Sequence, residues 1–121
     1  MDLAQIHGRL ATTVVLFTIL AGLWCLIAAL RRRPVESSIW GILAVGEILF
    51  LAQGAMGVIL YLEGQRPARG LHILYGAITA LTLPAYYAIS KGRDDNRAQW
   101  IYALLFFFLT AIGLRAITTA S

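Results

Sequence analysis

The chain has 121 residues, of which 60% are hydrophobic and 13% charged, and its formal net charge at pH 7 is +4. A soluble domain of this size keeps much of its surface in water and could not hide so large an apolar fraction, so the composition indicates a membrane protein. The basic residues lie mostly in short segments between apolar runs, where they set membrane topology, so nucleic acid is not an expected partner.

The sequence predicts an all-α integral-membrane protein. An apolar bilayer core of about 30 Å needs about 20 helical residues, and lipid admits only structures that satisfy their own backbone hydrogen bonds. Short connectors force neighbouring helices to run antiparallel, so residues 1–121 should form one up-down-up-down four-helix bundle. We expect helices over about residues 6–30, 39–62, 71–90 and 100–118.

Lysine and arginine are distributed unevenly between the two ends of this bundle. Six of them lie in the first and third connectors, against four at the end that holds both termini and the middle connector. Because cytoplasmic loops are enriched in Lys and Arg, this difference predicts that both termini lie outside. We expect the chain to reside among lipids in the inner membrane of a bacterium or archaeon.

Each of the two histidines opens an apolar run and lies four residues before a small side chain. His7 precedes Ala11, and His72 precedes Gly76. A step of four residues returns to the same helix face, so each pair leaves a flat space beside an imidazole, which a haem macrocycle requires. We predict that His7 and His72 are the metal ligands of one haem b iron, with Ala11 and Gly76 facing the macrocycle. The alternative is a structural or interfacial role for both histidines.

The depths of the two histidines differ along their helices. His7 lies about 36 Å of helix from Arg31, and His72 lies about 28 Å from Lys91, at about 1.5 Å per residue. The difference of about 7 Å must be absorbed by tilt, by unequal cytoplasmic helix ends, or by a kink at Pro84, which lies inside the third helix.

Other polar residues extend the predicted cofactor site. Haem carries carboxylates, and arginine binds carboxylates well; the arginines at the histidine end of the bundle are Arg9, Arg66, Arg69 and Arg115. Gln53 begins a stretch of small residues, Gln53–Gly57, that offers an amide and then either helix packing or a face for the cofactor. Glu47 lies deeper in the same run and suggests either a proton or quinone site or a contact with a partner subunit.

Four segments together resemble one half of a haem A synthase, a family built as a duplicated four-helix bundle. The first histidine segment is similar to the family's His-Arg-x-x-Ala opening, and the second helix contains its Gln-x-x-x-Gly pattern. The resemblance implies a haem ligated by a histidine on the first helix and one on the third, here His7 and His72. The segments are HGRLATTVVLF, LAQGAMGVILYL, GLHILYGAI and, more loosely, AIGLRAITT.

The chain also departs from that family. Gly8 separates His7 from Arg9, and Ala4 occupies the position of the family's catalytic carboxylate, with Asp2 the nearest acidic residue. The resemblance therefore leaves enzymatic activity open and retains haem ligation.

Three functions follow from these features. The first is a b-type cytochrome that transfers electrons within a respiratory or photosynthetic membrane assembly, with quinone among its potential partners. The second is a half-size enzyme similar to haem A synthase, acting as a homodimer. The third is a non-catalytic accessory subunit of a larger membrane complex, in which a histidine binds the magnesium of a chlorin pigment.

Overall fold

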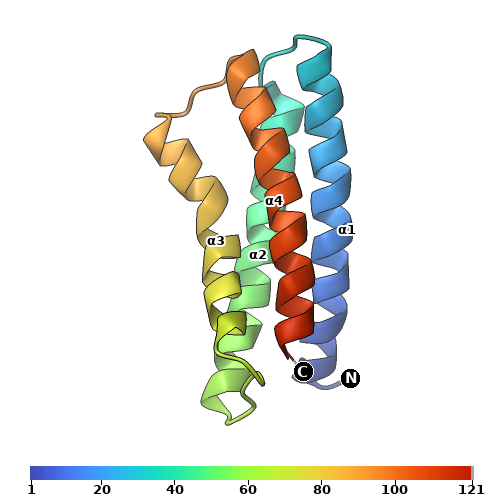
Figure 1. Ribbon diagram of the computed structural model, residues 1–121, viewed down its shortest axis with the longest axis vertical. Coiled ribbons are helices and arrows are strands. Elements are labelled where there is room, and N and C mark those ends of the chain that lie inside the picture. Colours follow the sequence, from blue (N-terminus) through green and yellow to red (C-terminus); the bar gives the residue numbers. More distant parts are fainter. Residues whose placement is uncertain (121) are drawn as a thin grey trace.

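The structure is a computed structural model that describes residues 1–120, and it shows an elongated bundle of four helices (Figure 1). Each helix is long and apolar enough to cross a bilayer, so the predicted all-α, membrane-spanning class is confirmed. Both ends of the chain lie at the same end of the bundle, as the up-down-up-down order requires (Figure 1). The helices are α1 (Leu3–Leu30), α2 (Ser37–Leu62), α3 (Leu71–Ile89) and α4 (Asn96–Ala120).

Three of the helices begin before the residues predicted for them, and side-chain caps extend two of these, α1 and α4. Asp2 Oδ1 accepts a hydrogen bond of 2.9 Å from the Gln5 amide N–H, while Gln5 Oε1 accepts one of 3.2 Å from the Asp2 N–H. This reciprocal pair satisfies two amide groups that a helix start leaves without partners. At α4, Asp95 Oδ1 accepts a hydrogen bond of 2.9 Å from the Ala98 N–H. The polar first turns therefore belong to the helices.

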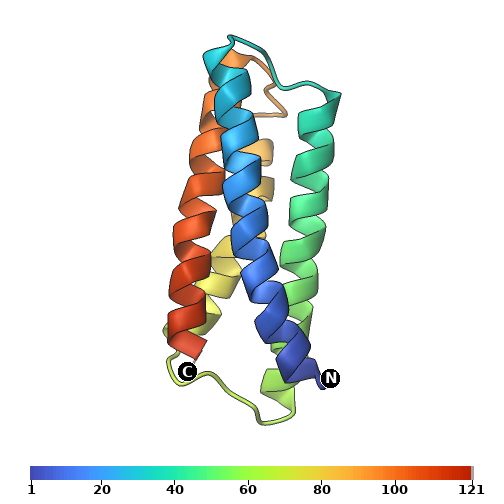
Figure 2. The same ribbon diagram turned by 90° about the vertical axis from the view of Figure 1, so that its right-hand side faces the viewer.

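The helices are arranged as a four-sided ring in chain order. The α1 helix packs most extensively on α4 and less on α2, while α3 packs on α4 and, least of all, on α2. Figure 2 shows α1 in front of the bundle and α3 behind it, with α4 and α2 on either side. Side chains on α1 and α3 can therefore meet only across the interior of the bundle.

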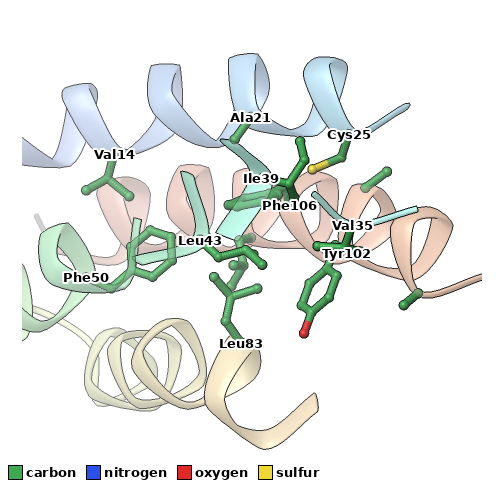
Figure 3. Packing of buried hydrophobic residues seen from close by; sticks show 13 residues of the cluster. Val14, Ala21, Cys25, Val35, Ile39, Leu43, Phe50, Leu83, Tyr102 and Phe106 are labelled. Atoms are coloured by element: carbon green, nitrogen blue, oxygen red, sulfur yellow. The ribbon is translucent and has the colours of Figure 1, made fainter. Parts of the chain in front are cut away.

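The largest buried cluster lies in the half of the bundle away from the termini. Figure 3 shows Cys25, Tyr102 and Phe106 packed between α1, α2 and α4. Glycine allows close approach here, since a Cβ on Gly22 would lie 2.9 Å from Cε1 of Phe107. On α3, by contrast, Leu83 is the one residue described as fully buried. The half that holds the termini is consequently less densely packed.

The structure accommodates the different depths of the two histidines through the shape of α3. This helix has 19 residues, against 28 in α1, and it contains Pro84. Its C-terminal part leans away from the other helices and ends short of the end of α1 (Figure 1). A proline inside a helix removes one hydrogen bond and favours such a kink. The kink and the unequal helix ends together allow the histidines to meet.

Side-chain amides join the connectors at the other end of the bundle. Asn96 Nδ2 donates to the carbonyl oxygens of Ala29, at 3.1 Å, and Arg33, at 2.9 Å, where α1 ends. Gln99 Nε2 donates to the carbonyl of Pro34 at 3.1 Å. These bonds satisfy carbonyls that a helix end leaves free, and they fix the start of α4 against the end of α1.

Candidate functional site

The two histidine rings lie next to each other inside the bundle. Their centroids are 6.2 Å apart and their planes make an angle of 74°. His7 comes from α1 and His72 from α3, which occupy diagonal corners of the ring of helices. The predicted juxtaposition of these two imidazoles is therefore present in the structure.

The ring of His72 is held by the main chain of α4. Its Nδ1 lies 2.7 Å from the carbonyl oxygen of Ala116. A carbonyl can only accept a hydrogen bond, so Nδ1 carries a proton, and in the neutral imidazole Nε2 then carries the lone pair. Histidines that bind metals commonly donate their second ring N–H in this way, which fixes both the tautomer and the ring orientation.

His7 is held through its backbone. The amide of Gln53, on α2, donates a hydrogen bond of 2.7 Å to the carbonyl oxygen of His7. Nδ1 of His7 is buried without a hydrogen-bond partner among the described residues, and so is Oε1 of Gln53. The structure therefore gives Gln53 a direct role in positioning α1 at His7, alongside the contact with a cofactor that the sequence predicts.

One glycine of α2 lies directly against the imidazole of His7. A Cβ built on Gly57 would lie 3.3 Å from Cε1 of His7 and 3.8 Å from its Nε2, so this ring rests on the glycine of the neighbouring helix. A Cβ on Gly54 or Gly76 would meet no atom within 4 Å beyond its own helix surroundings. Ala11 lies half-buried on α1, one turn from His7. Among these small residues, only Gly57 contacts a histidine ring, while Gly54 and Gly76 face open space.

The sequence analysis named Gly57 as the end of the Gln53–Gly57 stretch but did not predict that it contacts His7. Gln53 and Gly57 are four residues apart and share one face of α2. The amide of the first contacts the backbone of His7, and the second contacts the ring of the same residue. A polar residue followed four positions later by glycine can thus mark a helix face that receives a histidine from a neighbour.

The predicted cationic residues surround the same end of the bundle. Arg9, Arg69 and Arg115 are all exposed. The ion pairs found within residues 1–120 join Arg33 to Glu36 and Arg93 to Asp95, so none of these three arginines has an acidic partner there. Each remains free to bind a carboxylate of another molecule. Arg66, in contrast, places its guanidinium 4.1 Å from the centre of the Tyr61 ring.

His7 and His72 offer two nitrogen ligands, which suits some kinds of metal site and not others. Residues 1–120 contain no cluster of three or more His, Cys, Asp or Glu side chains that could hold a metal ion. A protein zinc site needs three or four such ligands. A tetrapyrrole brings four nitrogens of its own and needs at most two from the protein. His7 and His72, whose ring centroids lie 6.2 Å apart, are the residues that would hold the metal of such a group.

The nearest carboxylate does not point to a catalytic role. Asp2 caps α1 through the hydrogen bond with the Gln5 amide and is exposed. Ala4, at the position of the catalytic carboxylate in haem A synthases, is also exposed.

The fold and the site together define a membrane-spanning four-helix bundle with an inward-facing histidine pair. Comparison of the chain with protein-family models, with curated proteins and with solved structures gives no match. The resemblance to haem A synthase therefore stays a prediction that rests on the sequence motifs.

Proposed function

We propose that this protein is an integral-membrane b-type haem protein and that His7 and His72 are the axial ligands of its iron. The approach of the two imidazoles to a centroid distance of 6.2 Å carries the proposal. Both imidazoles are half-buried, and polar side chains that face the interior of a membrane bundle are usually functional. Two histidines from diagonal helices are difficult to explain as interfacial anchors, because an anchor would turn its ring toward the headgroups.

The surrounding residues have complementary roles in this proposal. The Ala116 carbonyl fixes the tautomer that leaves Nε2 of His72 free, and Gln53 fixes the backbone that carries His7. The free guanidinium groups of Arg9, Arg69 and Arg115 would bind the carboxylates of the haem. A bound haem supplies a one-electron couple, and two imidazole ligands leave no position open for O2. We therefore propose single-electron transfer within a respiratory or photosynthetic membrane assembly.

The experiment that tests this function is spectroscopy of the purified protein in detergent. We expect a reduced-minus-oxidised spectrum of a low-spin b-type haem, with about one haem per chain and no change on adding carbon monoxide, because both axial positions are filled. A colourless protein that does not take up added haem would refute the proposal. An extracted chlorin would support the pigment-binding accessory subunit instead, and a chemically modified haem would support the enzyme similar to haem A synthase.

We further propose that both termini and the α2–α3 connector face the outside of the cytoplasmic membrane of a bacterium or archaeon. The distribution of Lys and Arg supports this orientation. The histidine pair would then lie near the outer face, where a periplasmic or extracellular electron carrier could approach it.

Thiol labelling should reveal this orientation in intact cells. We expect a membrane-impermeant thiol reagent to label Gln65→Cys in whole cells and Asp94→Cys only after permeabilisation. Both positions are exposed, and neither substitution alters the Lys and Arg balance. The native Cys25 is 0% exposed, so the unmodified protein is a silent control. The opposite labelling pattern would place the histidines at the cytoplasmic face.

A further inference from the structure

A second polar site lies in the half of the bundle away from the histidines. A cavity of about 230 Å³ opens on the surface between α2, α3 and α4. Its walls include Trp40 and Glu47 of α2, Pro84 and Tyr87 of α3, and Tyr102 of α4. The mouth lies where α2 and α3 make their smallest contact and where α3 leans away from the bundle (Figure 1).

Two of the residues that line this cavity each carry a polar atom without a partner within residues 1–120. Oε1 of Glu47 and the hydroxyl of Tyr102 are each buried without a hydrogen bond among the described residues. Tyr102 is only 1% exposed, and Figure 3 shows its hydroxyl directed away from α1 and toward α3. A buried polar group left unpaired costs about 1–3 kcal/mol, so two such atoms beside one cavity favour a ligand that offers them complementary groups.

The remaining walls are aromatic and apolar. The Trp40 ring meets that of Tyr87 at a centroid distance of 5.7 Å and that of Tyr102 at 5.9 Å, in both cases edge to face. A wall of these three aromatic rings suits a flat ligand ring better than a flexible acyl chain. A lipid acyl chain would fill the space but would leave Glu47 and Tyr102 without hydrogen bonds.

We propose that this cavity binds the head group of a lipid-soluble quinone or quinol. The ring oxygens would bond to Glu47 and Tyr102, since a carboxyl group and a phenol can each donate or accept. The volume is below the roughly 300–1,000 Å³ of pockets for drug-sized ligands, so one ring enters and an isoprenoid tail stays in the lipid. Access from the side of the bundle allows the ligand to arrive through the membrane.

Of the residues that line the cavity, Glu47 is the one nearest to the histidine end along α2. Glu47 precedes Gln53 by six residues on α2, which is about 9 Å of helix, and Gln53 contacts His7. Binding of the head group stands independently of the haem. Only the role of the ligand as an electron donor or acceptor rests on the proposed function.

Tryptophan fluorescence tests the proposal, because quinones quench an indole that they contact. The reporter protein is the full chain with Trp24→Phe and Trp100→Phe, which leaves Trp40 as the single tryptophan. Titration with a short-chain benzoquinone in detergent should give saturable quenching. Tyr102→Phe and Glu47→Leu should each weaken binding about tenfold, the equivalent of one hydrogen bond, and the double variant should abolish saturation.

Control variants outside the cavity distinguish a loss of quinone binding at this site from a general effect of substitution on the protein. Tyr61→Phe and Glu63→Gln make related changes near the end of α2, outside this cavity, and should leave the dissociation constant unchanged. Circular dichroism and gel filtration check that each variant folds. Two results would overturn the proposal: quenching that rises linearly without saturation, or equal dissociation constants in the site variants and the control variants. Either would mean that the cavity holds only lipid or water. Recording the haem spectrum of the same samples distinguishes this outcome from failure of the proposed function.

Discussion

Replacing either His7 or His72 with alanine is expected to remove the low-spin haem signal from the purified protein. Each substitution deletes one of the two proposed protein ligands, and the chain has no third histidine to replace it. Loss of groups that merely orient a metal ligand costs 10–100-fold in affinity, so loss of the ligand itself should lower haem content by at least about that factor. Absorbance spectra and the haem-to-protein ratio measure the effect.

The substitution His72→Met provides a readout that a purely structural role would not produce. Methionine can bind haem iron and raises its reduction potential, so this variant should keep a six-coordinate haem with a higher potential. Thr12→Ala, at an exposed position on α1 near His7, is the control and should leave spectrum and potential unchanged. A full haem signal in both alanine variants would contradict the assignment of the two ligands.

The second large effect is expected at Gly57, which supports the His7 ring. A Cβ there would lie 3.3 Å from Cε1 of His7, tight enough to require a small shift of the ring. Gly57→Ala should therefore reduce haem affinity modestly. Gly57→Leu should reduce it more than about tenfold, because overpacking forces side chains away from their preferred positions and the added carbons occupy the space beside Nε2. Titration of each variant with haem measures its haem affinity, which should fall from the native protein to Gly57→Ala and further to Gly57→Leu.

Gly41 is the matched control for this series. It lies on the same helix, and a Cβ there would meet no atom within 4 Å, so Gly41→Leu should leave haem affinity unchanged. Thermal unfolding in detergent shows whether Gly57→Leu still folds. Equal haem affinity in the native protein and in a folded Gly57→Leu variant would mean that His7 is not held against α2 when haem is bound.

The bundle combines a densely packed half with a more open half. The buried cluster of Cys25, Tyr102 and Phe106, together with the amide bonds from Asn96 and Gln99, holds α1 and α4 together at one end. At the other end, Gly57 lies against the ring of His7. Apolar packing within a membrane gains little from excluding water, so close contacts and polar bonds must supply the stability. Most of the fully buried side chains lie in the first of these halves, and fewer lie in the half that holds the histidines.

The sequence alone was sufficient for the number, type and order of the helices. The length and apolar character of a run decide whether it spans a bilayer, and short connectors decide that neighbours are antiparallel. These are local properties. They also placed His7 and His72 at the same end of the bundle, although helix rise alone left a difference of about 7 Å between them.

Contacts between helices required the tertiary structure. The apolar residues of α1 and α2 are spread around each helix, so the sequence does not show which face turns inward. In lipid an outward face is as apolar as an inward one, and amphipathic patterning is therefore weak. The support of His7 by Gly57 depends on this rotation of the helices, as does the bond between His72 and the Ala116 carbonyl.

The sequence by itself thus determined a four-helix membrane bundle with two histidines near one end, because hydrophobic length and loop length are encoded residue by residue. Only the tertiary structure decided that the two rings meet at 6.2 Å, and that Glu47 and Tyr102 line one cavity. Both outcomes depend on how α3 bends and how each helix turns about its axis. Those quantities are set by packing among all four helices.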